Sequence, residues 1–253
     1  MTRYRFKVIR DNLQSSISYS SGEELKTDIS LNYRYLARIL RQVMIVPDRQ
    51  LLDKRLTLNT LPAVEEWLTS GKSVVVLMGH VGNWEWAGLY LGMKYPGRVC
   101  ALYKQIKSSR VNKWMLKRRG TTVDHLIEAK KMNELVRLIK TKSVLVLMIA
   151  DQNPGNDQGI IWTDFLQKKT AFTGGPETLA TKFQLPVVYL HTTTTREGQY
   201  HLAFEIITDG TQNLNKGEIT HRYAKALERN ILEQRSEWLW SHKRWKRNPE
   251  LKN

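Results

Sequence analysis

The sequence predicts an α/β fold with a mostly parallel central sheet, helices on both faces of the sheet and an antiparallel hairpin at its edge. From residue 71 on, strand-like runs alternate with helix-like stretches, which is typical of parallel strands joined by crossover helices. Residues 74–78 and 144–150 are wholly apolar, as strands buried on both faces are. A short polar turn separates the runs 186–195 and 200–208, and this arrangement predicts the hairpin.

Residues 1–70 are predicted to form a helical extension that packs on the core, and residues 71–253 to form the α/β domain. A short basic segment, 3–13, is followed by an amphipathic helix within Ser21–Pro47. Its apolar residues recur at intervals of three and four, with arginines elsewhere on the turn. This pattern fits a helix that covers a sheet or one that lies on a membrane. A further helix is expected over 61–68.

The α/β domain is expected to follow in a regular order. The expected strands span 73–78, 99–103, 121–124, 144–150, 186–195 and 200–208. The expected helices span 83–93, 109–119, 129–140, 175–183 and 218–234. Residues 151–156 are predicted to be a loop because of their turn-forming residues, and a Trp- and Arg-rich tail covers 238–247.

Composition excludes several classes of protein. A hydrophobic content of 41% and eight Trp exclude a disordered chain. The single Cys, Cys100, excludes a disulfide framework, and no His or Cys residues cluster at ligand spacing, so no metal is expected. No apolar run reaches the ~18 to 20 residues that cross a bilayer, and no signal peptide is recognisable. The sequence therefore predicts a soluble or peripheral protein.

The formal charge of +16, from 40 Lys and Arg against 24 Asp and Glu, predicts an anionic partner. Nucleic acid, a membrane surface and an acidic protein all fit this charge. Seven cations follow one another with no acid between them: Lys104, Lys107, Arg110, Lys113, Lys117, Arg118 and Arg119. They indicate either a docking surface or a solvated helix face, and the interleaved aromatic residues leave single-stranded nucleic acid as an alternative.

Polar side chains follow both buried strands, where open α/β sheets place their ligands. His80 and Glu85 follow the first strand, and a His with a carboxylate can form a base and the group that orients it. The alternative is a half-buried His and a Glu that suits a helix N-terminus. Asp151 and Gln152 follow the second strand and converge with His80 if the two strands are parallel neighbours. The alternative for Asp151 is a structural turn-former, its commonest role at such a position.

A third candidate is the small-residue stretch before the helix 175–183. Thr173 and Gly174 lie there, with hydroxyls and backbone N–H groups that can form an anion or oxyanion site. The same stretch reads equally well as a plain connector. No Gly-rich phosphate loop or dinucleotide fingerprint is present.

Six blocks in order carry a resemblance to a known family. His80-Val-Gly-Asn-Trp-Glu85 matches the His-x4-Asp/Glu box of glycerolipid-type acyltransferases, and its Gly-Asn-Trp-Glu form resembles the bacterial lipid A late acyltransferases, the lauroyl and myristoyl transferases. The other matching blocks are Tyr103-Lys104 with Asn112 and Arg119-Gly120; Ala150-Asp151-Gln152; Phe165 with Thr170 to Gly175; Pro186-Val-Val; and Trp238 to Pro249. The resemblance spans residues 60–250, with Lys104 where the family often has Arg and with Phe172 interrupting a run of small residues.

The resemblance implies transfer of a fatty acyl chain from an acyl carrier thioester to a lipid hydroxyl, with no cofactor besides the donor. His80 would be the general base and Glu85 its orienting partner, in a direct transfer without an acyl-enzyme. The expected substrate-binding residues are Asn83, Tyr103, Lys104, Arg119, Asp151, Gln152, Thr173 and Gly174. The candidate acyl-channel residues are Trp84, Trp86 and Leu89, although a stripe of this kind is more often plain core.

The resemblance also implies partners and a location. The donor is expected to be an acidic acyl carrier protein or coenzyme A, the acceptor a lipid A precursor or related hydroxylated lipid in an anionic membrane, and nucleic acid is not expected. The location would be the cytoplasmic face of the bacterial inner membrane, peripherally or through an N-terminal anchor missing from this chain, as family members usually begin with one. Trp238, Trp240 and Trp245 suit a membrane interface or pack the last helix. The alternatives are a basic membrane- or nucleic-acid-binding module and a lipid or thioester hydrolase.

Overall fold

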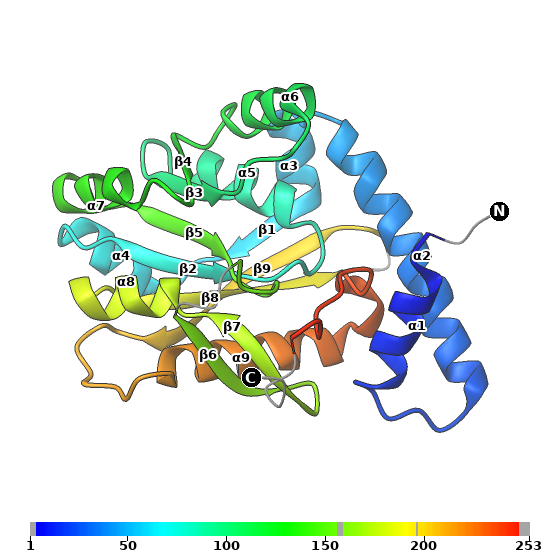
Figure 1. Ribbon diagram of the computed structural model, residues 1–253. Helices are drawn as coiled ribbons and strands as arrows, with labels where there is room; N and C mark the ends of the chain where they lie inside the picture. The colour runs from blue at the N-terminus through cyan, green and yellow to red at the C-terminus, as the bar shows by residue number, and fades with distance from the viewer. Residues whose placement is uncertain (1–3, 156–158, 196, 248–253) are drawn as a thin grey trace.

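A computed structural model describes residues 4–155, 159–195 and 197–247, and its centre is a seven-stranded sheet in the order β1-β9-β8-β2-β5-β3-β4 (Figure 1). The strands of this sheet are β1 Leu56–Asn59, β2 Val74–Met78, β3 Val99–Tyr103, β4 His125–Glu128, β5 Leu145–Ile149, β8 Val187–Thr194 and β9 Tyr200–Thr208. Neighbouring strands are parallel except β8 and β9, which form the antiparallel hairpin that the sequence predicts. The mixed α/β fold class is thereby confirmed.

Helices cover both faces of the sheet. They are α1 Phe6–Gln14, α2 Gly22–Met44, α3 Arg49–Arg55, α4 Pro62–Thr69, α5 Trp84–Lys94, α6 Ser109–Arg119, α7 Met132–Thr141, α8 Gly175–Phe183 and α9 Glu218–Glu233. The sequence of β2 is wholly apolar because its alternate side chains enter two different cores. Val75 and Leu77 face a core shared with α1, α2, α8 and α9, whereas Val74 and Val76 face α3, α4 and α5.

β1 lies outside the hairpin and pairs with β9, so the N-terminal part of the chain contributes the edge strand. The sequence pattern did not predict this strand, which belongs to residues 1–70. The division of the chain at residue 70 stays a prediction. Among the described residues, no helix has the length and apolar character needed to span a bilayer.

The strand expected over 121–124 is wrong, since β4 begins at His125. Residues 121–124 form the turn after α6, where the Thr122 hydroxyl donates to the carbonyl of Leu89. Asp124 accepts the backbone N–H groups of Gly97 and Val99, at the start of β3. These hydrogen bonds to distant parts of the chain override the strand preference of the β-branched residues.

A second, two-stranded sheet was not predicted. β6 (Ile160–Phe165) and β7 (Lys168–Thr173) form an antiparallel hairpin beside α9. Its two connecting residues, Leu166 and Gln167, have φ of 49° and 63°, values that suit a tight hairpin turn but that usually call for Gly or Asn. Because neither connecting residue is Gly or Asn, the sequence does not indicate a turn here.

The C-terminal tail packs inside the molecule. Trp238 and Trp240 are buried, and the rings lie edge to face with centroids 4.7 Å apart. The Trp245 indole N–H donates to the Thr170 hydroxyl at 2.9 Å. A membrane-interface role for Trp238 and Trp240 is therefore wrong, and the packing alternative describes them.

Candidate active site

His80 lies in a short loop after β2 that the surrounding structure holds in place. A Cβ on Gly79 would come 2.5 Å from the end of a leucine side chain of α9, so α9 packs closely against this loop. Gly82 has a φ of +56°, which favours glycine. The Tyr35 hydroxyl lies 3.2 Å from the carbonyl oxygens of both His80 and Gly82, and the Gly82 N–H donates to Glu237. These contacts fix the backbone on either side of the imidazole.

Asp151 holds the imidazole of His80. The two side chains meet because β2 and β5 are parallel neighbours, which is the condition under which the sequence predicts their convergence. His80 Nδ1 lies 2.6 Å from one carboxylate oxygen, Oδ1. The other, Oδ2, accepts the His80 backbone N–H and the Trp238 indole N–H, both at 2.8 Å. Because a carboxylate only accepts, Nδ1 carries a proton and Nε2 is left as the basic nitrogen.

Asp151 is buried, with 1% of its surface exposed. Burial alone would raise the pKa of its carboxyl, but the charge of His80 and the hydrogen bonds from His80 and Trp238 outweigh burial and lower the pKa to about 2. The carboxylate therefore stays ionised at neutral pH, where it stabilises a positive charge on the imidazole.

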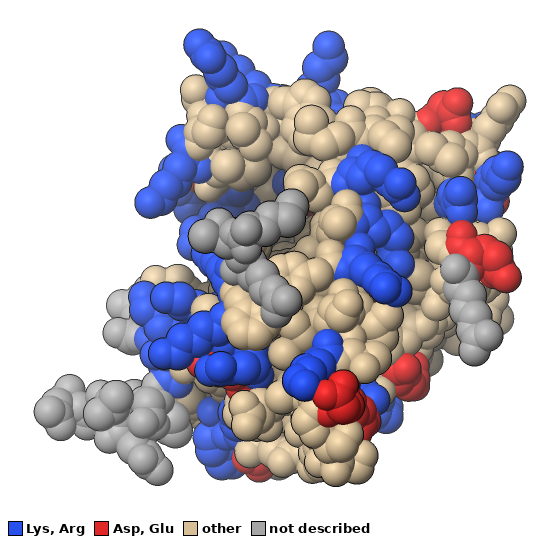
Figure 2. Space-filling model, turned by 90° about the vertical axis from the view of Figure 1, so that its right-hand side faces the viewer, with Lys and Arg blue, Asp and Glu red and all other residues tan. Residues whose placement is uncertain are grey.

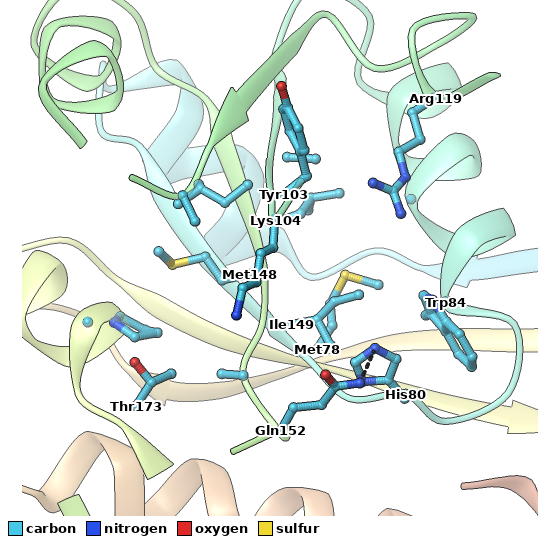
Figure 3. A pocket seen from close by; sticks show the side chains of 18 of the residues that line it. Met78, His80, Trp84, Tyr103, Lys104, Arg119, Met148, Ile149, Gln152 and Thr173 are labelled. Carbon is cyan, nitrogen blue, oxygen red and sulfur yellow. Dashed lines mark hydrogen bonds between the residues drawn. The ribbon is translucent and has the colours of Figure 1, made fainter. Parts of the chain in front are cut away.

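The basic nitrogen of His80 faces Gln152. The side-chain amide nitrogen of Gln152 lies 3.2 Å from His80 Nε2, the contact drawn as a dashed line in Figure 3. With Nδ1 protonated, the amide N–H donates to the Nε2 lone pair. The Trp84 ring stands edge to face against the imidazole, with centroids 4.8 Å apart.

Glu85 does not contact the imidazole. Its carboxylate accepts two hydrogen bonds from Arg119, at 2.6 and 3.1 Å, and one from Arg118 at 3.2 Å. Glu85 lies in the first turn of α5 and faces α6, so its prediction as the partner of His80 is wrong. Arg118 is fully buried; burial lowers the pKa of its guanidinium, and Glu85 opposes this shift.

A cavity of about 520 Å³ lies beside these groups at the carboxyl edge of the sheet (Figure 3). Its apolar wall includes Met78, Leu89, Ala101, Leu102, Val123, Met132, Leu147 and Ile149. The predicted site residues that it brings together are His80, Trp84, Glu85, Leu89, Tyr103, Lys104, Arg119, Gln152 and Thr173. The arrangement offers a base at one side of an apolar chamber with cationic side chains around it. Among the described residues, no group of His, Cys, Asp and Glu is placed to hold a metal ion.

A comparison with known protein families identifies the family of the chain. The family of bacterial lipid A biosynthesis acyltransferases matches residues 2–247. The chain belongs to this family. The family membership confirms the resemblance carried by the six sequence blocks and supports acyl transfer in lipid A biosynthesis as the activity. A comparison with curated proteins gives no match.

Three residues predicted to touch substrate lie away from the cavity in this family member. Asn83 caps α5, where its oxygen accepts the Trp86 N–H and its amide donates to Gln42, so both ends of its side chain are occupied. The Trp86 ring is buried in the core and its indole N–H donates to the Gln42 carbonyl. The Gly174 N–H donates to the carbonyl of Gly159 at 2.8 Å and is not available to an oxyanion. These contacts fit the alternatives of plain core for Trp86 and a connector for Gly174, and they make Asn83 a helix cap.

Sequence reasoning missed two residues and gave a third a different role. Asp151 was expected to bind substrate, but it lies behind His80 as its hydrogen-bond partner. Trp238 supplies a second donor to Asp151 from the far end of the chain, and Arg118 is the buried partner of Glu85. Both belonged to segments noted for their charge and aromatic content, and only the fold shows which side chains turn inward.

Proposed function

We propose that the protein transfers a fatty acyl chain from a thioester donor, an acyl carrier protein or coenzyme A, to a hydroxyl of a lipid A precursor or a related hydroxy-acyl lipid. The observation that carries the proposal is the Asp151–His80 pair, whose basic nitrogen lies beside a mostly apolar cavity. A base in an apolar chamber suits a reaction that joins a lipid hydroxyl to an acyl chain.

In the proposed reaction, His80 Nε2 takes the proton of the acceptor hydroxyl while the hydroxyl oxygen attacks the thioester carbonyl. The tetrahedral intermediate collapses, the carbon–sulfur bond breaks, and the departing thiolate takes the proton from the imidazolium. Asp151 remains ionised throughout and stabilises the imidazolium at Nδ1, the part that a carboxylate plays in hydrolase triads. The step needs no other reactant.

Direct transfer is proposed because the cysteine is unsuited to carry the acyl group. Cys100 is fully buried, and its burial raises the pKa of the thiol to about 12. A thiol of this kind is a poor nucleophile at neutral pH. The acceptor hydroxyl is then the group that attacks the donor.

Gln152 is proposed to steady the oxyanion. Its amide N–H occupies the position on His80 Nε2 that the acceptor hydroxyl needs. When the hydroxyl takes that position, the displaced N–H remains next to the carbonyl under attack and can donate to its developing negative charge. Gln152 would thus protect the base at rest and assist it during the reaction.

The cavity walls divide the substrates by polarity. The apolar wall, with Leu89 and Leu102, is proposed to contact the acyl chain. Trp84 is proposed to contact the end of the chain nearest His80. The Lys104 ammonium points into the cavity in Figure 3 and, among the described residues, has no acidic partner, so it suits an anionic group of donor or acceptor. Arg119 is already paired with Glu85. The proposed location is the cytoplasmic face of the inner membrane.

The test combines purified protein with acyl carrier protein and coenzyme A thioesters and a panel of hydroxylated lipids, followed by mass spectrometry of the lipid product. We expect a new acyl ester whose formation falls by at least about a hundred-fold in His80→Gln. Release of free fatty acid at the same rate with and without acceptor would indicate a hydrolase instead. Unchanged ester formation by His80→Gln would refute the mechanism.

A further inference from the structure

We propose that the outer face of α2, together with the neighbouring α6, docks on a bilayer surface that bears anionic lipids. Four large apolar side chains stand exposed within seven residues at the C-terminal end of α2: Leu40 (67%), Met44 (65%), Ile45 (44%) and Val46 (51%). Apolar side chains gathered in this way usually mark a site of protein or membrane interaction.

The exposed side chains form an apolar face at the end of α2 that the protein core leaves uncovered. The helix packs on the protein core through residues that include Ile29, Tyr35 and Ile39. Leu40 and Met44 are four residues apart and therefore share one stripe of the helix, and Leu40 continues the side that carries Ile29 three turns earlier. A helix that is apolar both toward the protein and toward solvent is suited to lie in a membrane interface.

Cations surround this apolar face. On α2, Arg34 and Arg41 are exposed, and the exposed cations of α6 and the loop before it are Lys107, Arg110, Lys113 and Lys117. None of these six makes an ion pair with another described residue. Figure 2 shows the side of the molecule that carries α2, where Lys and Arg outnumber Asp and Glu. Asp48 follows this apolar face in the sequence, and its carboxylate accepts a backbone N–H at the start of α3, so it caps that helix. Apolar side chains beside unpaired cations favour an anionic lipid surface over nucleic acid.

The proposed docking face borders the cavity. The carbonyl of Ile45 accepts a hydrogen bond from Arg118 at 3.4 Å, and Arg118 binds Glu85 in the cavity wall. Ile106, in the loop before α6, is 39% exposed and also lines the cavity. Docking would bring the cavity close to the bilayer. The proposal rests on the proposed function only in that this bilayer would supply the acceptor.

The experiment is flotation of the whole protein with vesicles of zwitterionic lipid alone or mixed with phosphatidylglycerol, without substrates. We expect binding to the anionic vesicles that falls by at least about ten-fold in Leu40→Asp/Met44→Asp. Leu232→Asp is the matched control, because Leu232 is exposed on α9 at 47% and lies outside the proposed face. Lys113→Glu/Lys117→Glu should weaken binding by about five-fold for each cation removed, whereas Lys216→Glu should leave it near the wild-type level.

Equal binding by wild type and Leu40→Asp/Met44→Asp, or an equal loss in Leu232→Asp, would overturn the proposal. So would α6 variants that float normally but no longer bind acyl carrier protein, because α6 would then face the carrier. Turnover of detergent-dispersed substrates is measured separately. Failure of vesicle binding with normal turnover rejects the docking face alone, and vesicle binding without any turnover rejects the proposed function alone.

Discussion

Asp151→Asn should nearly abolish acyl transfer while the fold persists. In the wild-type protein, Oδ2 of Asp151 accepts two N–H groups, from the His80 backbone and from Trp238. The only oxygen of the new amide must occupy this position, because an amide nitrogen there would face two donors. The amide nitrogen is thereby turned toward His80 Nδ1.

This orientation reverses the tautomer of the imidazole. An amide N–H cannot accept the proton of Nδ1, so the ring is expected to carry its proton on Nε2 and to accept with Nδ1. The nitrogen next to the cavity then has no lone pair to take the proton of an acceptor hydroxyl. The loss of the carboxylate also removes the charge that stabilises the imidazolium. A loss of about 10²- to 10⁴-fold in the rate of transfer follows, or about 3 to 5 kcal/mol in activation free energy.

The assay is the initial rate of ester formation with saturating acyl donor, together with nitrogen-15 shifts of the His80 ring that report its tautomer. Asp164→Asn serves as the control, because Asp164 is an exposed carboxylate on β6 that pairs with Lys169. The reasoning is refuted if Asp151→Asn keeps a third or more of the wild-type rate, or if its rate falls although Nε2 remains unprotonated.

The remaining predictions concern stability and the second polar group of the site. The lowered pKa of Asp151 implies about 2 kcal/mol of stability that is present above pH 4 and lost as the pH falls toward 2, measurable as the acid slope of the unfolding free energy. Glu85→Gln leaves two arginines without a buried counter-charge and should cost about 3 to 5 kcal/mol, seen in denaturant unfolding. Gln152→Leu should lower kcat about 10²-fold with an unchanged melting temperature. Gly92→Ala places a Cβ 2.4 Å from a backbone oxygen and should cost about 1 to 3 kcal/mol, whereas Gly88→Ala on the same helix meets its neighbour at 3.9 Å and should not destabilise.

The sequence predicts the buried strands and the crossover helices because both follow from local patterns. The wholly apolar runs became β2 and β5, and the helices over 109–119 and 175–183 have the bounds that the pattern indicates. The β6–β7 hairpin escaped because its turn uses Leu166, a residue that rarely takes positive φ. β1 escaped because a strand of four residues at the edge of a sheet is determined by its pairing with β9 rather than by its own composition.

The sequence predicted the location of the site more accurately than the contacts between its side chains. The two strand tips were expected to converge if β2 and β5 were parallel neighbours, and they are, which sets Asp151 against His80. Which carboxylate reaches the ring depends on side-chain direction across the sheet, and the spacing of five residues between His80 and Glu85 contains no information about the competing acid 71 residues away.

Because His80 and Glu85 do not contact each other, the two ends of the His-x4-Glu box have separate roles. The short turn at Gly82 ends the loop of His80 and begins α5, so the imidazole stays with the sheet while the carboxylate starts the helix. There, Glu85 neutralises the buried Arg118 and holds Arg119 at the cavity wall. Removing Glu85 would therefore impair the reaction through the wall of the cavity and the stability of α6, and the tautomer of His80 would still be set by Asp151. Nitrogen-15 shifts of the His80 ring that report a reversed tautomer in Asp151→Asn and an unchanged tautomer in Glu85→Gln would distinguish these roles, since a carboxylate that orients the base must set its tautomer.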